Sequence, residues 1–153
     1  MALDFDGTVN AVLAHCVAAG AALTNPIVDV AYAHPLPRGR CIRIFYGGEA
    51  EPAHMGSDAR VLNGQMVAEL IRIVAFWPLS SSGETMAATV EAEVRALKHQ
   101  IRTRILGDSQ LGGLSTDLAL SNAITDFGAN GGIVYRTLEY EITTDYDEYA
   151  IAP

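Results

Sequence analysis

Histidine and cysteine side chains are the first candidates for chemistry in this chain of 153 residues. The four histidines are scattered, and no two of them have the close spacing with which one helix binds a metal ion. They are His15, His34, His54 and His99. Cys16 and Cys41 are too few for a disulfide framework and stand in no metal-ligand spacing. We therefore expect no metal site, and we expect both thiols to be reduced and packed as small apolar groups.

A pair of aspartates, Asp4 and Asp6, stands in the run Asp-Phe-Asp-Gly-Thr at positions 4–8. This run resembles the first motif of haloacid-dehalogenase-type phosphatases, which implies Asp4 as nucleophile, Asp6 as general acid and a magnesium ion. That chemistry needs the nucleophile at the end of a buried strand, and only three residues precede Asp4. The family's later parts are missing, since the only lysine is Lys98 and Gly107-Asp108 has no second aspartate. We interpret the pair as acidic residues at a helix N-terminus, where the dipole favours them.

No other catalytic pattern is present. The nucleophile elbow Gly-x-Ser-x-Gly is absent, and the serine run at 80–82 lacks the lysine and glycine spacing of a P-loop. Ser81 and Glu84 are instead spaced as a capping box before a helix. The sequence therefore predicts no catalytic residue, no cofactor and no enzymatic activity.

Composition is that of a folded protein: 50% of the residues are hydrophobic and 18% are charged. No apolar run reaches the roughly 20 residues that span a bilayer, so we expect no membrane contact. Acidic residues stand where a secretory signal would carry Lys or Arg, which disfavours export. The formal net charge of −8 repels phosphate backbones and disfavours a dedicated nucleic-acid binder. We expect one domain over 1–153.

Hydrophobic periodicity predicts two helices and five strands. In chain order they are a helix over 6–23, strands over 27–33, 41–46 and 66–77, a helix over 82–106, and strands over 118–127 and 133–144. The segment 35–40 is predicted to be a hairpin between the first two strands, and 47–64 a long loop. A turn is expected over 128–132, and the acidic residues 145–149 are expected to leave the sheet. The prediction is an α+β fold, an antiparallel or mixed sheet of about five strands packed by two helices, in the order α-β-β-β-α-β-β.

The apolar faces of these elements follow from the same spacing. The second helix carries one continuous stripe, composed of Met86, Val90, Val94, Leu97, Ile101 and Ile105. The first helix is expected to bury Val9, Val12, Leu13, Cys16 and Val17, with Asp6 or Thr8 as its cap. The strand 66–77 is apolar on both faces and is stopped by Pro78. Its second face is covered either by the second helix or by a neighbouring molecule.

The whole chain resembles the tail terminator proteins of long-tailed bacteriophages, and more broadly the small neck and tail-completion proteins, in size, element order and composition. The matching features are the first helix, the segment 35–37, the acidic loop 47–64, the strand that ends at Trp77-Pro78, the long helix and the closing hairpin that ends at Ile142. The resemblance implies a non-enzymatic virion protein, assembled in the host cytoplasm, that forms a ring, typically six-fold. Such a ring terminates the tail tube and joins the tail to the head. The implied partners are further copies of the chain, the tail tube protein and a head-completion or connector protein.

Ring subunits meet head to tail through two different surfaces. We expect acids of the loop 47–64 to reach a basic stripe on a neighbour's second helix. The interface candidates are Glu49, Glu51, Asp58, Arg60, Arg95, Lys98 and Arg102. Glu139 and Glu141, with the acids at 145–148, are expected to face a central channel through which DNA slides without specific binding. Two alternatives stay open: a monomeric α+β module that binds a ligand or peptide, and a small phosphatase acting through Asp4 and Asp6.

Overall fold

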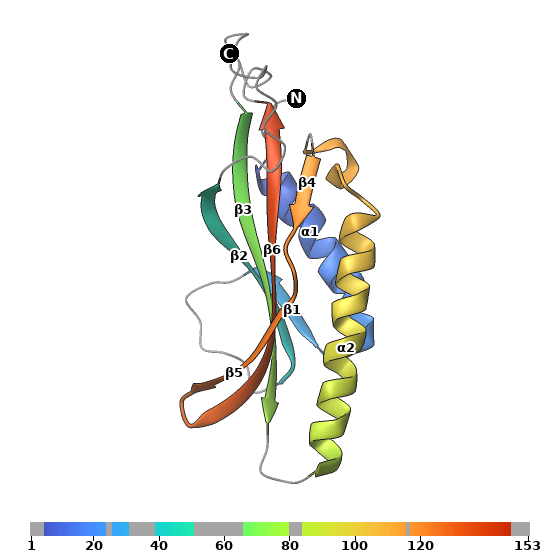
Figure 1. Cartoon of the computed structure of the whole chain (residues 1–153), viewed down its shortest axis with the longest axis vertical. Coiled ribbons are helices and arrows are strands. Elements are labelled where there is room, and N and C mark those ends of the chain that lie inside the picture. The colour runs from blue at the N-terminus through green and yellow to red at the C-terminus, as the bar shows by residue number, and fades with distance from the viewer. Residues whose placement is uncertain are drawn as a thin grey trace.

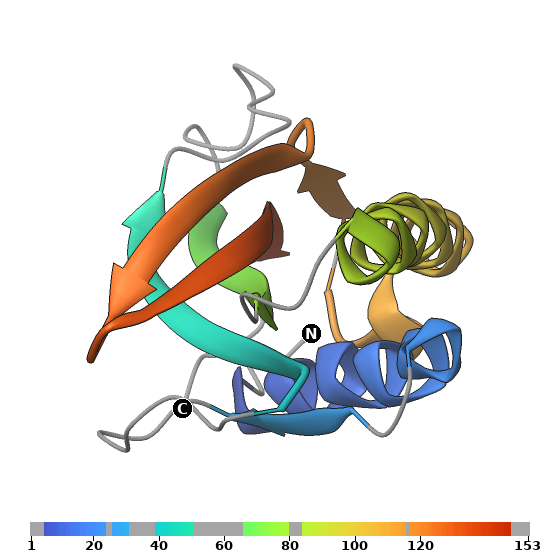
Figure 2. The same cartoon turned by 90° about the horizontal axis from the view of Figure 1, so that it is seen from below.

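A computed structural model describes residues 5–23, 26–30, 39–50, 66–79, 84–115 and 117–147. In these ranges the elements are α1 (Phe5–Ala19), β1 (Ile27–Val30), β2 (Cys41–Ala50), β3 (Met66–Leu79), α2 (Glu84–Leu106), β4 (Asp117–Leu120), β5 (Ile124–Asn130) and β6 (Ile133–Asp147). The predicted α+β class is confirmed, with two helices and a six-stranded mixed sheet. Both helices lie on the same side of the sheet (Figure 1), and Figure 2 shows them side by side there.

The sheet runs in the order β1-β2-β3-β6-β4, and β5 also pairs with β6. β4 and β5 follow one another along β6, because Leu120 is opposite Ile142 and Ile124 is opposite Glu139. Between them, the backbone N–H of Ser121 donates to the carbonyl of Glu141, and the Ser121 hydroxyl accepts from the Glu141 N–H, both at 2.9 Å. The single strand predicted over 118–127 is therefore two strands, and the sheet has six strands rather than about five.

The predicted hairpin between the first two strands is wrong. β1 and β2 pair in parallel, with Ile27 opposite Cys41 and Val30 opposite Ile44. A hairpin reverses the chain, whereas parallel neighbours need a crossover connection. Residues 31–38, which contain most of the predicted hairpin, lie outside the described residues. β2 also extends to Ala50, so residues 47–50 belong to a strand and not to the predicted loop, of which 51–64 lie outside the described residues.

The core lies between the sheet and the helices. β3 and β6 point alternate residues toward the helices, and the buried ones include Ile71, Ile73, Ala75, Trp77, Leu138, Tyr140 and Ile142. From α2 the same core receives Val90, Val94, Leu97, Ile101 and Ile105, each at most 3% exposed. The predicted stripe of this helix is confirmed at these five positions, and the side chain of Met86 lies outside the described residues.

The structure of α1 differs from the prediction in which side chains are buried on one side of the helix and in where the helix begins. Val12, Cys16 and Ala19 are fully buried, whereas Val17 is 57% exposed. The buried positions step by four and three, so Val17, about 100° around the helix from Cys16, falls outside the stripe. The helix already includes Phe5, so Asp6 stands in its first turn and Thr8 is buried within it, and neither residue is the predicted cap.

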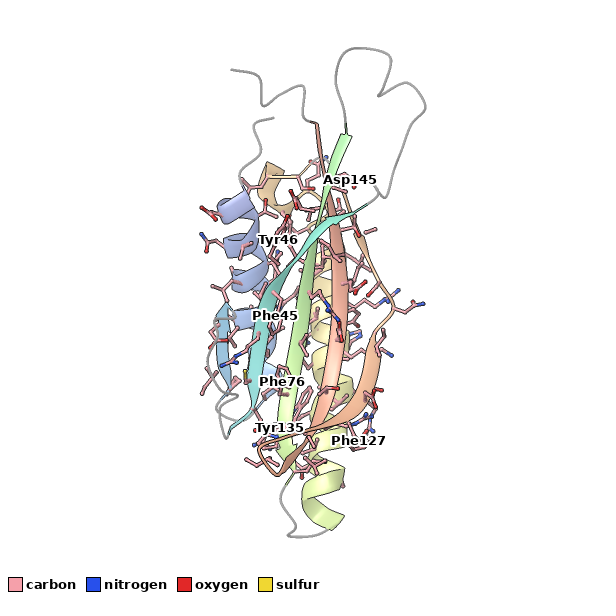
Figure 3. The ribbon with its side chains drawn as sticks, turned by 90° about the vertical axis from the view of Figure 1, so that its left-hand side faces the viewer. Phe45, Tyr46, Phe76, Phe127, Tyr135 and Asp145 are labelled. Atoms are coloured by element: carbon pink, nitrogen blue, oxygen red, sulfur yellow. The ribbon has the colours of Figure 1, made fainter. Side chains whose placement is uncertain are left out.

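The second face of β3 has no covering helix within the described residues. Leu70, Val74 and Phe76 are half-buried on this face and Arg72 is exposed. Figure 3 views this bare sheet face, with Phe45, Phe76 and Tyr135 along it and the helices behind. α2 therefore covers only the opposite face. β3 also continues past the predicted stop, since Pro78 is opposite Tyr135 and Leu79 opposite Val134.

β6 contains the predicted strand over 133–144 and extends beyond it to Asp147. Its connection to β5 is only Gly131-Gly132, at φ 60° and 79°, a left-handed conformation that glycine adopts without strain. The turn is shorter than predicted because residues 128–130 are still paired. The prediction that the acidic residues leave the sheet is wrong for 145–147: Asp145 is opposite Ala68 and fully buried, and Asp147 is opposite Met66.

Candidate functional site

In the phosphatase-like motif, residues 5–8 belong to α1 and not to a strand. Asp6 is exposed in the first turn of α1, and Asp4 lies outside the described residues. A nucleophilic aspartate of that chemistry would follow a buried strand, whereas here the motif runs into a helix. Within the described ranges, no group of three or more His, Cys, Asp or Glu side chains is arranged to hold a metal ion.

Both cysteines are free and buried, as predicted. Burial raises the pKa of the Cys16 thiol to about 12. Burial also raises the pKa of Cys41 to about 11, and the nearby Arg43 guanidinium opposes this rise. The thiolate is the reactive form of cysteine. Both side chains therefore stay protonated near neutral pH and act as packing groups.

His15 and Asp108 form the one histidine–carboxylate pair of the described residues. His15 Nε2 and Asp108 Oδ2 are 2.8 Å apart, with side chains 23% and 35% exposed. The hydrogen bond from His15, and then that from the Gly112 N–H, lower the pKa of Asp108. The turn that Asp108 holds contains Leu111, which is buried at a positive φ of 48°. The pair thus joins α1 to the turn after α2, a contact across 93 positions that sequence spacing does not reveal.

Asp108→Asn is expected to lower the free energy of unfolding by about 1 kcal/mol at neutral pH, because the pair is partly exposed. The pKa of Asp108 is lower in the folded protein than its usual 3.8. The contribution of ionised Asp108 to the free energy of unfolding is therefore complete above pH 3.8, and it disappears as the pH falls through the folded-state pKa. Urea unfolding of both proteins across the acidic range measures this, and a difference that grows toward low pH would contradict it.

α2 presents a basic stripe to solvent, composed of Arg95, Lys98 and Arg102. These residues step by three and four, so they follow one side of the helix. Arg102 also contacts the Tyr140 hydroxyl, which donates to the Lys98 carbonyl at 3.0 Å. Arg95 and Lys98 have no carboxylate at ion-pair distance in the part of the chain that is described. The predicted role of these residues in a subunit interface stays a prediction.

The bare sheet face carries an acidic strip, composed of Asp126, Glu139 and Glu141. Glu139 and Glu141 alternate on β6, and Asp126 is on the same face because it is opposite Thr137. Arg72 of β3 lies between the two glutamates: its Nε is 2.8 Å from Glu139 Oε1 and 3.7 Å from Glu141 Oε1. Glu139 and Glu141 thus share one guanidinium, whereas Asp126 lies farther along the strip, where Arg136 donates to its backbone carbonyl at 3.1 Å.

The β5–β6 hairpin bends away from the helices (Figure 1) and exposes apolar side chains. Ile124 is 59% exposed, Phe127 60% and Val134 46%. At its base, Arg136 bonds Glu91 of α2 at 2.7 Å and stacks over the Phe127 ring, with Cζ 4.5 Å from the centroid. The outer backbone edge of β5 has no partner strand among the described residues. Such an exposed edge with apolar side chains is a surface that other chains can bind.

The predicted interface residues divide into two groups. Arg95, Lys98 and Arg102 are placed together on α2, whereas Glu51, Asp58 and Arg60, and the side chain of Glu49, lie outside the described residues. Their predicted contact with the basic stripe stays a prediction. Glu139 and Glu141 are 24% and 44% exposed on the bare sheet face and share Arg72. Their predicted position in a channel also stays a prediction. Asp126 was not among the predicted residues, because only the β5–β6 register places it beside them.

Comparison with models of known protein families finds no match, and comparison with curated proteins finds no significantly similar sequence. Neither helix of the described residues is long and apolar enough to cross a membrane.

Proposed function

We propose that this chain is a structural protein that assembles head to tail into a closed ring, as the tail terminator proteins it resembles do. The observation that carries the proposal is the distribution of unmatched charge. Basic side chains are exposed on α2, and an acidic strip lies on the sheet face that the helices leave bare. Two complementary surfaces on different sides of one molecule favour heterologous association, which closes into a ring when the rotation permits.

The proposed role is to terminate the tail tube of a long-tailed bacteriophage and to join the tail to the head. The partners are other copies of the chain, the tail tube protein and a head-completion or connector protein. DNA would pass through without specific binding, since the net charge of −8 per chain does not favour contacts with phosphates. The order α-β-β-β-α-β-β-β is compatible with this role, and no step of it needs a catalytic residue or cofactor.

The test is the native mass of the purified protein, measured by light scattering over a range of concentrations, with negative-stain images of the same sample. A ring of six copies would have a mass of about 98 kDa, six times the 16.3 kDa of one chain. We expect this species to accumulate as concentration rises and to be annular in the images. A monomer that persists at the highest concentration would contradict the ring and favour the monomeric binding module. Magnesium-dependent hydrolysis of a phosphate ester, lost in Asp4→Asn, would favour the phosphatase.

A further inference from the structure

We propose that the ring contact joins the basic stripe of α2 in one copy to the acidic strip of the bare sheet face in the next copy. This inference rests on the proposed self-association and names the surfaces that form it. It assigns Glu139 and Glu141 to a subunit contact rather than to a channel. It also replaces the loop acids with acids of β5 and β6 as partners of the basic stripe.

The basic stripe carries positive charge that no neighbouring acid on the same helix segment neutralises. Arg95, Lys98 and Arg102 are exposed, and the exposed surface of α2 from Arg95 to Leu106 contains no acidic residue. The two acids one turn earlier are already paired within the chain, Glu91 with Arg136 and Glu93 with Arg40. In a molecule with net charge −8, this helix segment is a local positive surface, and it attracts a negative one.

The acidic strip is the matching surface. Glu139 and Glu141 share the single guanidinium of Arg72, so this pair keeps a local formal charge of about −1, and Asp126 adds a third carboxylate on the same face. Glu141 is the less paired of the two glutamates, since Arg72 is 3.7 Å from it and closer to Glu139. Asp126 is exposed, and its carboxylate accepts from the backbone N–H of Phe127 at 2.7 Å while its backbone carbonyl accepts from Arg136 at 3.1 Å. A second copy can therefore add cations here without displacing a buried ion pair.

Each charged set has an exposed apolar neighbour that can supply affinity. Leu106 follows Arg102 by one helical turn and is 49% exposed. Ile124 is opposite Glu139 on the adjoining strand and is 59% exposed. Charges at an interface chiefly set orientation and association rate, whereas desolvated apolar side chains set its stability. Both components are present on both surfaces.

The two surfaces lie on different sides of the sheet. α2 packs on the inner face of the sheet and carries the stripe on the side of the helix where Glu91 bonds Arg136, whereas the acidic strip is on the outer face, which Figure 3 presents. Because the surfaces lie on different sides of the sheet, contact between them joins different copies, and it can continue head to tail from one copy to the next. Head-to-tail contact uses both surfaces of every copy, as a ring requires.

The test compares two charge reversals, Arg95→Glu with Arg102→Glu, and Glu139→Arg with Glu141→Arg, in the full chain. Each double variant is expected to weaken self-association by roughly tenfold or more, because attraction becomes repulsion at two positions. Mixing the two variants should restore association, since each contributes one intact surface. The variant with all four reversals should also assemble. Glu139→Gln with Glu141→Gln gives a milder change if three arginines together impair folding.

Arg104→Glu is the matched control, because Arg104 is exposed on α2 but lies about 200° around the helix from Arg102. It should leave assembly unchanged, and far-ultraviolet circular dichroism checks the fold of every variant. Intact rings in the Glu139 and Glu141 variants would overturn the inference, and slowed DNA passage in those rings would favour the channel role. Loss of rings with no recovery on mixing would also overturn it. A wild-type protein that never associates would contradict the proposed function itself.

Discussion

Leu97→Ala is expected to lower the free energy of unfolding by about 3 kcal/mol, because it empties a fully packed site. Leu97 is completely buried near the middle of α2, where the helix faces the core. The loss combines the transfer free energy of the removed methyl groups with the cost of a cavity, since a helix and a sheet cannot close fully around it. Urea denaturation followed by circular dichroism measures the change, with an unaltered slope against urea concentration.

Thr103→Ala is the control on the same helix. Thr103 is exposed, and alanine has the higher helix propensity, so its effect should be within about 0.5 kcal/mol of zero or slightly stabilising. Equal losses in both variants would mean that α2 does not pack on the sheet as described.

Arg136→Met is expected to cost about 2 kcal/mol and to loosen the β5–β6 hairpin. The guanidinium bonds Glu91 at 2.7 and 3.4 Å, donates to the Asp126 carbonyl at 3.1 Å and stacks on Phe127. Methionine keeps an apolar stem but loses the charge-assisted bonds and the cation–π contact. Hydrogen exchange should therefore become faster at the backbone amides of β5 that bond β6.

Glu91→Gln separates the two contributions of that arginine. It removes the charge pair but leaves Arg136 its contacts with Phe127 and the Asp126 carbonyl, so its cost should be smaller and β5 should stay protected. Unchanged exchange in Arg136→Met would show that the hairpin is held by strand pairing alone.

Local periodicity predicted the parts of the fold whose burial is decided by one element. The five core positions of α2 recur every three or four residues, and β6 alternates every second residue from Val134 to Thr143. These spacings follow from the geometry of a helix and a strand, so they are visible without knowledge of the partner. Val17 was misassigned because a run of apolar residues on a helix does not show where the buried stripe ends.

The spacing of hydrophobic residues does not determine which strands pair or in which direction they run. The prolines between β1 and β2 are compatible with a hairpin, yet the strands are parallel. The direction in which two strands pair is a long-range property that local residue spacing does not encode. Asp145 was expected outside the sheet on account of its charge. It remains in β6 because β3 begins early enough to pair with it at Ala68.

The two candidate surfaces differ in the same way: one depends on a single element and the other on the pairing of two. The basic stripe is a property of one helix and was predicted from sequence. The acidic strip depends on the register between β5 and β6, which puts Asp126 opposite Thr137 and on the same face as Glu139. The two-residue turn Gly131-Gly132 sets that register, whereas the sequence predicted a longer turn over 128–132.

The central pairing of β3 with β6 determines how this chain can fold. Register partners such as Met66 and Asp147 are about 80 positions apart, so closing this pair costs much chain entropy before any contact offsets it. The β5–β6 hairpin, with its two-residue glycine turn, can form within about 10 μs, whereas the centre of the sheet must assemble late. During synthesis, β3 therefore lacks one neighbour until β6 is made, from Val134, the partner of Leu79, to Asp147, the partner of Met66. Over that interval its apolar edge is open to wrong partners, and the growing chain depends on rapid completion or on chaperones to avoid them.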